Sequence, residues 1–190
     1  MFNPKKLIKE LDELPKKYIV MITVNATDYL TVNLEILRYL CNKRRLHGIY
    51  VSVNRPYRSM INIMENNGIY TDNIFFVDCI STIVGDTPFR TERCLFTSPE
   101  DLTDLAVLID QWVRNLPRED KFLFLDSLST LLIYNSIGTV AQFSHFLTGK
   151  MRMWGLNGVF VSLEKESNPE ILDKISQFCD KIINISEWKI

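Results

Sequence analysis

One apolar run that stops at a carboxylate constrains the fold of this chain more than any other feature. The segment Phe-Leu-Phe-Leu at residues 122–125 is followed directly by Asp126 and Ser127. Four successive apolar residues are typical of a strand buried on both faces, as in a parallel sheet that helices cover on each side. Asp126 is then expected at the carboxyl end of the strand, which is where open α/β sheets bind their ligands.

Asp126 has two interpretations at this point. An Asp at the end of such a strand commonly holds a magnesium ion in phosphate-handling proteins. Asp followed by Ser is also an ordinary start of a helix, in which a side chain caps the first turn. Residue type alone favours the cap, and the rest of the chain has to decide.

The remainder of the chain alternates between apolar strands and amphipathic helices. Strands are predicted at 18–24, 48–53, 74–78, 157–163 and 181–185, in addition to the one that ends at Asp126. Helices are predicted at 1–14, 30–41, 56–64, 99–116, 140–154 and 169–178, with Asn54 capping the third and Ser98-Pro99-Glu100-Asp101 opening the fourth. Residues 80–97 have no clear period and form the longest predicted loop. This order predicts one domain over residues 1–190, a three-layer α/β fold with a mainly parallel central sheet.

Composition limits the class of protein. The 190 residues are 46% hydrophobic and carry a formal net charge of -1, so bulk charge gives no reason to expect a nucleic-acid or membrane protein. Residues 1–14 mix lysines with acids, which differs from a signal peptide. The four cysteines show no CxxC spacing, which favours free thiols over a metal site. We therefore expect a cytoplasmic protein.

Several segments together resemble the RecA superfamily, closest to the KaiC-like branch that is common in archaea. They are the strand, loop and helix at 18–42, Gly-Ile-Tyr-Val-Ser-Val at 48–53, Phe-Leu-Phe-Leu-Asp-Ser-Leu-Ser-Thr-Leu at 122–131 and Gly-Val-Phe-Val-Ser-Leu-Glu at 158–164. The resemblance covers the chain from about residue 14 to 185. It implies a P-loop-type fold in which strand 158–163 lies between the first strand and the strand of Asp126, with ATP at their carboxyl edge. Asp126 matches the magnesium-coordinating acid of the family. With this resemblance, the magnesium role and the capping role of Asp126 are about equally favoured.

The phosphate-binding loop is where this chain departs from the family. The family motif is GxxxxGK[ST], and residues 24–31 read Val-Asn-Ala-Thr-Asp-Tyr-Leu-Thr. In the family motif the two glycines let backbone N–H groups approach the phosphates closely, and here Val24 and Tyr29 replace them. Leu30 replaces the lysine. Only Thr31 matches. If Asp28 faced a phosphate at about 4 Å, the repulsion would be about 4 kcal/mol at an effective dielectric of 20.

The water-activating acid of the family is missing as well. Family members usually carry a Glu after the second strand, whereas Val53 is followed here by Asn54 and Arg55, neither of which is a general base at neutral pH. The sequence therefore predicts a pseudo-ATPase that is not an enzyme. It predicts no cofactor beyond weak ATP and magnesium on Thr31 and Asp126.

Basic residues with interleaved aromatics form one further candidate site, for single-stranded nucleic acid. The candidates are Lys43, Arg44, Arg45, Arg55, Tyr57, Arg58, Arg90 and Arg93. Solvated helix and loop ends explain these charges more simply, so this interpretation ranks last.

Three classes of function remain open. The first is a protein-interaction or regulatory module that keeps the fold as a scaffold and associates with partners or with itself as a homo-oligomer. The second is residual nucleotide binding through Thr31 and Asp126, and the third is a nucleic-acid-binding accessory role. A fold of this kind cannot choose among them by itself.

Overall fold

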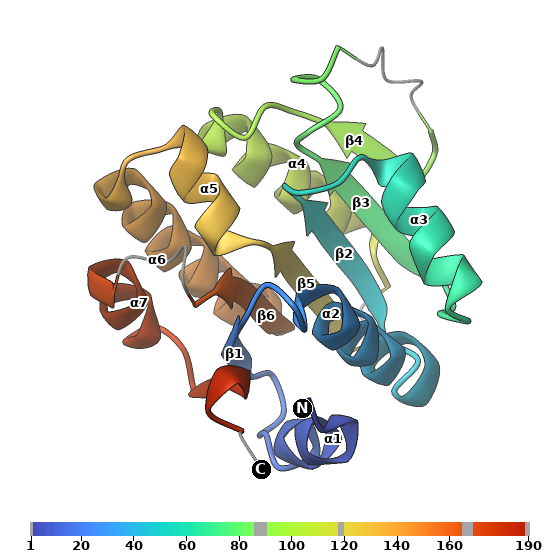
Figure 1. Ribbon diagram of the computed structural model, residues 1–190. Coiled ribbons are helices and arrows are strands. Elements are labelled where there is room, and N and C mark those ends of the chain that lie inside the picture. The colour runs from blue at the N-terminus through green and yellow to red at the C-terminus, as the bar shows by residue number, and fades with distance from the viewer. Residues whose placement is uncertain (1, 86–90, 118–119, 165–168, 189–190) are drawn as a thin grey trace.

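The central element of the protein is a seven-stranded sheet in which every strand pairing is parallel (Figure 1). We analysed a computed structural model, which describes residues 2–85, 91–117, 120–164 and 169–188. The strand order is β4-β3-β2-β5-β6-β1-β7. The strands are β1 (Ile19–Val24), β2 (His47–Ser52), β3 (Ile74–Asp78), β4 (Cys94–Phe96), β5 (Lys121–Asp126), β6 (Leu156–Leu163) and β7 (Lys181–Asn184). The predicted fold class is confirmed, and β6 lies between β5 and β1 as expected.

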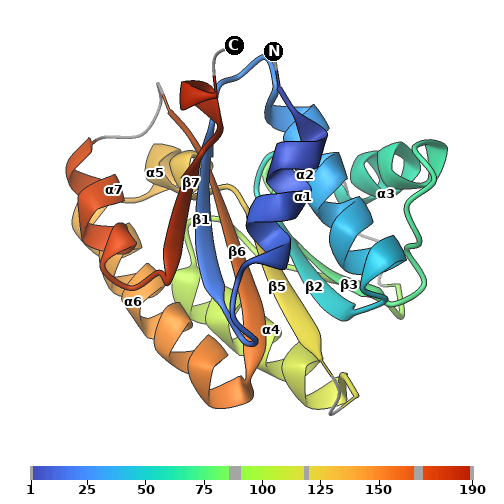
Figure 2. The same cartoon turned by 90° about the horizontal axis from the view of Figure 1, so that it is seen from below.

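Helices cover both faces of the sheet and make three layers (Figure 2). The helical segments are α1 (Pro4–Asp12), α2 (Tyr29–Leu37), the π-helical turn η1 (Arg38–Lys43), α3 (Tyr57–Asn66), α4 (Leu102–Asn115), α5 (Leu128–Tyr134), α6 (Ile137–Trp154), α7 (Pro169–Ser176) and the 3-10 turn η2 (Ile185–Glu187). Helices α1, α2 and α3 pack on one face, and α4 to α7 pack on the other.

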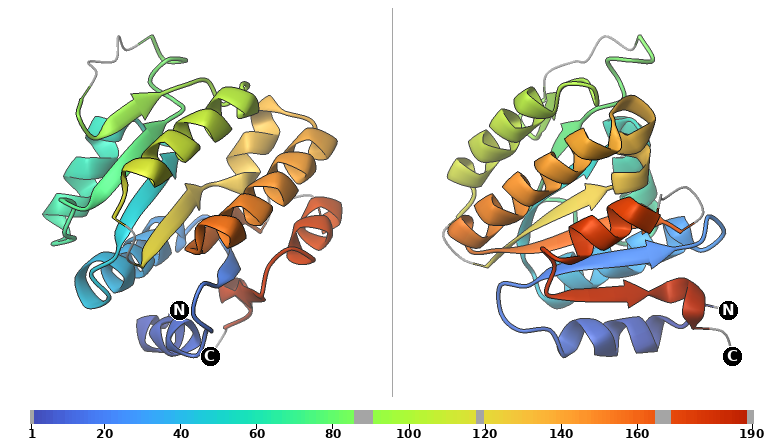
Figure 3. Two further views of the ribbon diagram at one scale, coloured as in Figure 1. Left: turned by 180° about the vertical axis from the view of Figure 1, so that it is seen from behind. Right: turned by 90° about the vertical axis from the view of Figure 1, so that its left-hand side faces the viewer.

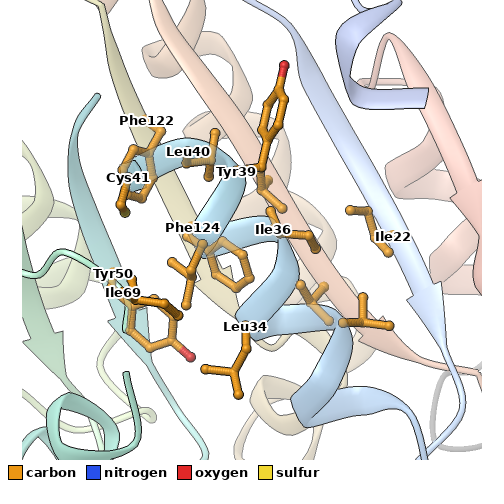
Figure 4. Packing of buried hydrophobic residues seen from close by; sticks show 14 of the residues in the cluster. Ile22, Leu34, Ile36, Tyr39, Leu40, Cys41, Tyr50, Ile69, Phe122 and Phe124 are labelled. Carbon is orange, nitrogen blue, oxygen red and sulfur yellow. The ribbon is translucent and has the colours of Figure 1, made fainter. Parts of the chain in front are cut away.

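The core follows from the unbroken apolar strands. All six residues of β1 and all six of β5 are buried, because helices contact both faces. Figure 4 shows Leu40 of η1 beside Phe122 of β5, and Ile36 of α2 on the side of Ile22 of β1.

Gly48 shows how closely the core is packed. A Cβ atom at this position would lie 2.0 Å from the Phe122 ring, so only glycine fits there.

The first helix packs on its own domain. Leu7 and Leu11 of α1 are 0% and 1% exposed and belong to the core beside β1. The predicted helix at 1–14 is thus confirmed, with narrower bounds.

Two predicted helix boundaries need correction. Helix α4 begins at Leu102 rather than Pro99, because the Asp101 carboxylate accepts the N–H of Asp104 at 2.8 Å and so caps the helix there. The region after β5 contains a separate helix α5, and α6 starts after its own cap at Ser136.

The predicted loop 80–97 is wrong at its end. Cys94–Phe96 form β4 and pair with β3, which extends the sheet to its edge. Three residues are too few for a recognisable apolar pattern. Residues 86–90 of this predicted loop lie outside the described residues.

Two statements complete the fold. The thiols of Cys41, Cys79, Cys94 and Cys179 are free, as predicted. Within the described ranges, no helix combines the length and apolarity that crossing a bilayer requires.

Candidate functional site

Asp126 lies at the carboxyl end of β5, in the middle of the sheet. It is paired in register with Ser52 on β2 and Val161 on β6, and it is only 1% exposed. Burial raises the pKa of this carboxyl group to about 8, because the charged form loses its hydration. The group is therefore a buried acid that is largely neutral at pH 7.

Both carboxyl oxygens of Asp126 have partners from the same chain. The Tyr50 hydroxyl group donates to Oδ2, and the Asn54 side-chain amide donates to Oδ1 at 3.1 Å. Tyr50 is completely buried on β2, and burial raises the pKa of its hydroxyl group as well. A metal ion at Asp126 would have to compete with these two donors for the carboxyl oxygens.

Asn54 connects four elements at this edge. Its amide nitrogen also donates to the Tyr29 hydroxyl group, while its Oδ1 accepts a hydrogen bond from the Thr130 hydroxyl group. The prediction that Asn54 caps the helix after Pro56 is wrong. The first turn of α3 is capped instead by Asp78, whose carboxylate accepts the Tyr57 N–H at 2.7 Å.

Tyr29 closes the site from the side of β1. It is the first residue of α2 and is 9% exposed, so its ring is part of the core and only its hydroxyl group meets the polar network. In the loop before it, Asn25 accepts the N–H of Asp28 at 2.9 Å and donates to the Asp28 carboxylate at 3.0 Å. Thr31 is exposed two residues into the helix.

Hydroxyl groups after Asp126 tie β5 to α5 and β6. Ser127 Oγ lies 2.9 Å from Thr130 Oγ1 and 3.0 Å from Ser129 Oγ, and Ser129 Oγ accepts the N–H of Leu163 at 3.1 Å. Ser127 is the N-cap of α5, so the capping role considered for Asp126 belongs to its neighbour. The peptide bond between Asp126 and Ser127 is cis.

Asp78 is a second buried acid at the same edge. Its carboxylate accepts four hydrogen bonds, from the N–H groups of Tyr57, Ile80 and Ser81 and from the Ser81 hydroxyl group, at 2.6 to 2.9 Å. Asp78 was not predicted as a site residue. Its position after the apolar run of β3 was the same signal that drew attention to Asp126.

Six of the residues predicted to bind nucleic acid flank β2 in the sequence. Lys43, Arg44 and Arg45 precede β2, whereas Arg55, Tyr57 and Arg58 follow it, so a strand of about 20 Å separates the two groups. Arg93 donates to the Thr71 carbonyl group at 3.0 Å, and Arg90 lies outside the described residues.

Glu164 and the acid, His and Cys side chains of the described residues form no further site. Glu164 is exposed after β6. In the part of the chain that the structure describes, no three His, Cys, Asp or Glu side chains cluster as a metal site would require.

Three solved structures with a similar fold are proteins of Pyrococcus horikoshii. The KaiC-like protein PH0186 aligns with a TM-score of 0.64 and 13% identity over 90% of this chain and 72% of its own. The uncharacterized protein PH0321, solved in complex with an unknown peptide, aligns with a TM-score of 0.73 and 12% identity over 95% of this chain and 82% of its own. A third protein, PH0250, aligns with a TM-score of 0.61 and 15% identity over 97% of this chain and 88% of its own. These likenesses establish a KaiC-like fold.

Sequence comparison gives the family. No curated protein sequence matches at a significant level. The model of a family of unknown function, DUF7504, matches residues 65–185, which is more than half of the chain and includes Asp126 but not Tyr29, Tyr50 or Asn54. The chain belongs to the DUF7504 family.

Proposed function

We propose that this protein is a non-catalytic KaiC-like domain that has lost ATP hydrolysis and acts by binding other proteins, as an interaction or regulatory module. The observation that carries the proposal is the state of Asp126. The acid that matches the magnesium ligand of the family is 1% exposed, and both of its oxygens are bonded to Tyr50 and Asn54. The carboxyl group of Asp126 therefore binds side chains of its own domain.

Binding a nucleotide here would disrupt these contacts. A magnesium ion needs the charged carboxylate, and with a pKa of about 8 ionisation at pH 7 costs about 1.4 kcal/mol before any hydrogen bond is lost. Tyr29 stands where the family motif has its second glycine, and its buried ring and bonded hydroxyl group support a closed loop. Leu30 supplies no charge in place of the lysine.

The protein-binding part of the proposal has separate support. A fold that is kept without a nucleotide still presents several helical surfaces to partners. PH0321 has the same fold, and its structure holds an unknown peptide. We expect this chain also to bind polypeptide.

Calorimetry with ATP and magnesium ions tests the nucleotide part. We expect a dissociation constant weaker than about 1 mM, which corresponds to less than about 4 kcal/mol of binding free energy, and no ATPase activity above background. The Asp126→Ala variant is the control, because turnover that persists in it comes from a contaminant. A micromolar constant would instead support the residual nucleotide site at Thr31 and Asp126.

A further inference from the structure

A groove runs between α4 and α6 on the face of the sheet opposite α2. Two adjoining hollows of about 290 and 370 Å³ share Thr103, Ala106 and Phe146 in their walls. Figure 3 shows the two helices side by side in both views, α4 in yellow-green and α6 in orange. The residues that line the groove are different from those of the Asp126 network.

Exposed apolar side chains gather along this groove. Val107 on α4 is 58% exposed, and Phe146 and Met153 on α6 are 50% and 80% exposed. Val107 and Phe146 line the first hollow of the groove, and Phe146 and Met153 line a neighbouring hollow whose walls belong to α6 alone, so Phe146 links the two. Contiguous apolar surface of this kind marks an interaction site, whereas single exposed apolar residues do not.

The charges beside the patch are unbalanced. The ammonium group of Lys150 lies over the rings of Phe146 and Trp154, at 5.7 and 5.6 Å from their centroids, and it has no carboxylate within ion-pair distance among the described residues. Helix α6 contains no Asp or Glu in its 18 residues. Asp110 is the one acid that lines the described hollows, and Arg114 holds it at 2.6 Å. The groove thus presents an apolar floor and an unmatched cation.

We infer that this groove binds an amphipathic helix of another protein, with apolar side chains on one face and a carboxylate beside them that reaches Lys150. The inference rests on the proposed function and names its binding surface. A helix laid in a groove between two helices is a common mode of peptide recognition, with anchors at i, i+3, i+4 and i+7.

Charge argues against a second copy of this chain as the occupant. A symmetric interface uses the same patch on both subunits, so each Lys150 could find a counter-charge only among the acids of that patch. The patch offers only Asp110 in exchange, and that carboxylate is already paired. Complementary charge therefore has to come from a different surface.

Selection from a displayed library of helical peptides against the immobilised full chain tests the inference. We expect enriched peptides to combine helically spaced apolar residues with Asp or Glu. Phe146→Asp should weaken their binding at least about tenfold, and Lys150→Glu should do the same and favour basic peptides. Ile133→Asp is the matched control, because Ile133 is 70% exposed on α5 outside the groove and should leave binding unchanged.

Three results would overturn the inference. The first is that no peptide is enriched. The second is that enriched peptides bind Phe146→Asp as well as the wild type, while the variant melts at the same temperature. The third is that the protein is a dimer in light scattering and that Val107→Asp converts it to a monomer. The last would make a second copy the occupant. Failure of the proposed function would be seen in a different experiment, as micromolar ATP binding in calorimetry. The two failures can therefore be told apart.

Discussion

Replacing Asp126 with Asn tests the buried network through the pH dependence of stability. Burial raises the pKa of Asp126 to about 8 in the folded protein, whereas an unfolded Asp titrates near 3.8. Between these values the folded state holds one proton more than the unfolded state, so stability falls as pH rises. A full proton difference corresponds to about 1.4 kcal/mol per pH unit. Hydrogen bonds from Tyr50 and Asn54 favour the charged form and reduce this effect. We therefore expect the free energy of unfolding to fall by about 2 kcal/mol between pH 5 and pH 7.

The assay is urea unfolding of both proteins across this pH range. Asn at position 126 stays neutral and keeps an oxygen that accepts the Tyr50 hydroxyl group. The wild type should therefore lose about 2 kcal/mol relative to Asp126→Asn on going from pH 5 to pH 7. Asp72→Asn is the control, since that side chain is 98% exposed and its effect should not change over the same range.

A constant difference between wild type and Asp126→Asn would refute this reasoning. It would mean that the folded protein keeps Asp126 ionised and that its two donors outweigh the loss of hydration. A buried carboxylate in that state would be ready to bind a cation. The magnesium role would then regain support.

Three further substitutions probe the packing, each measured by urea unfolding. Asn54→Ala should cost about 2 to 4 kcal/mol, because several buried polar partners lose their hydrogen bonds together, and a change below about 1 kcal/mol would contradict the network. Asn33→Ala should stay within about 1 kcal/mol of the wild type, because this fully buried amide has no hydrogen-bond partner among the described residues and its burial already costs about 1 to 3 kcal/mol; a larger loss would indicate a bound water. Leu7→Ala should cost about 2 to 4 kcal/mol and leave any homo-oligomer intact in light scattering, whereas dissociation would place α1 in an interface.

The sequence predicted those features that depend on local pattern. The strand that ends at Asp126 could be predicted because a strand buried on both faces needs an unbroken apolar run. The position of β6 between β5 and β1 was predicted from the resemblance, because the hydrophobic periodicity of a sequence does not determine which strands pair. The start of α4 was predicted at Pro99 and lies at Leu102, because Ser98 and Asp101 are both good caps by residue type and only the folded geometry selects Asp101.

The role of Asn54 could not be predicted from its neighbours. Asn before Arg-Pro has every local feature of a helix cap. Its actual partner, Asp126, lies 72 residues away and reaches it only because β2 and β5 pair in register. The hydrogen bonds of the Tyr29 and Tyr50 hydroxyl groups could not be predicted either, because a Tyr in an apolar segment is typical of the core and only its hydroxyl group belongs to the site.

The two acids at the strand ends share a structural role that bears on where binding occurs. Asp78 holds the start of α3 and the loop after β3 through four hydrogen bonds, and Asp126 holds Tyr50 and the Asn54 loop. Open α/β sheets bind ligands at this edge because their loops leave polar groups free there. Around Asp78 and Asp126 those groups bond to one another instead. If the proposed function is right, selection for binding has shifted to the outer helices, and α4 and α6 are where apolar exposure and unmatched charge coincide.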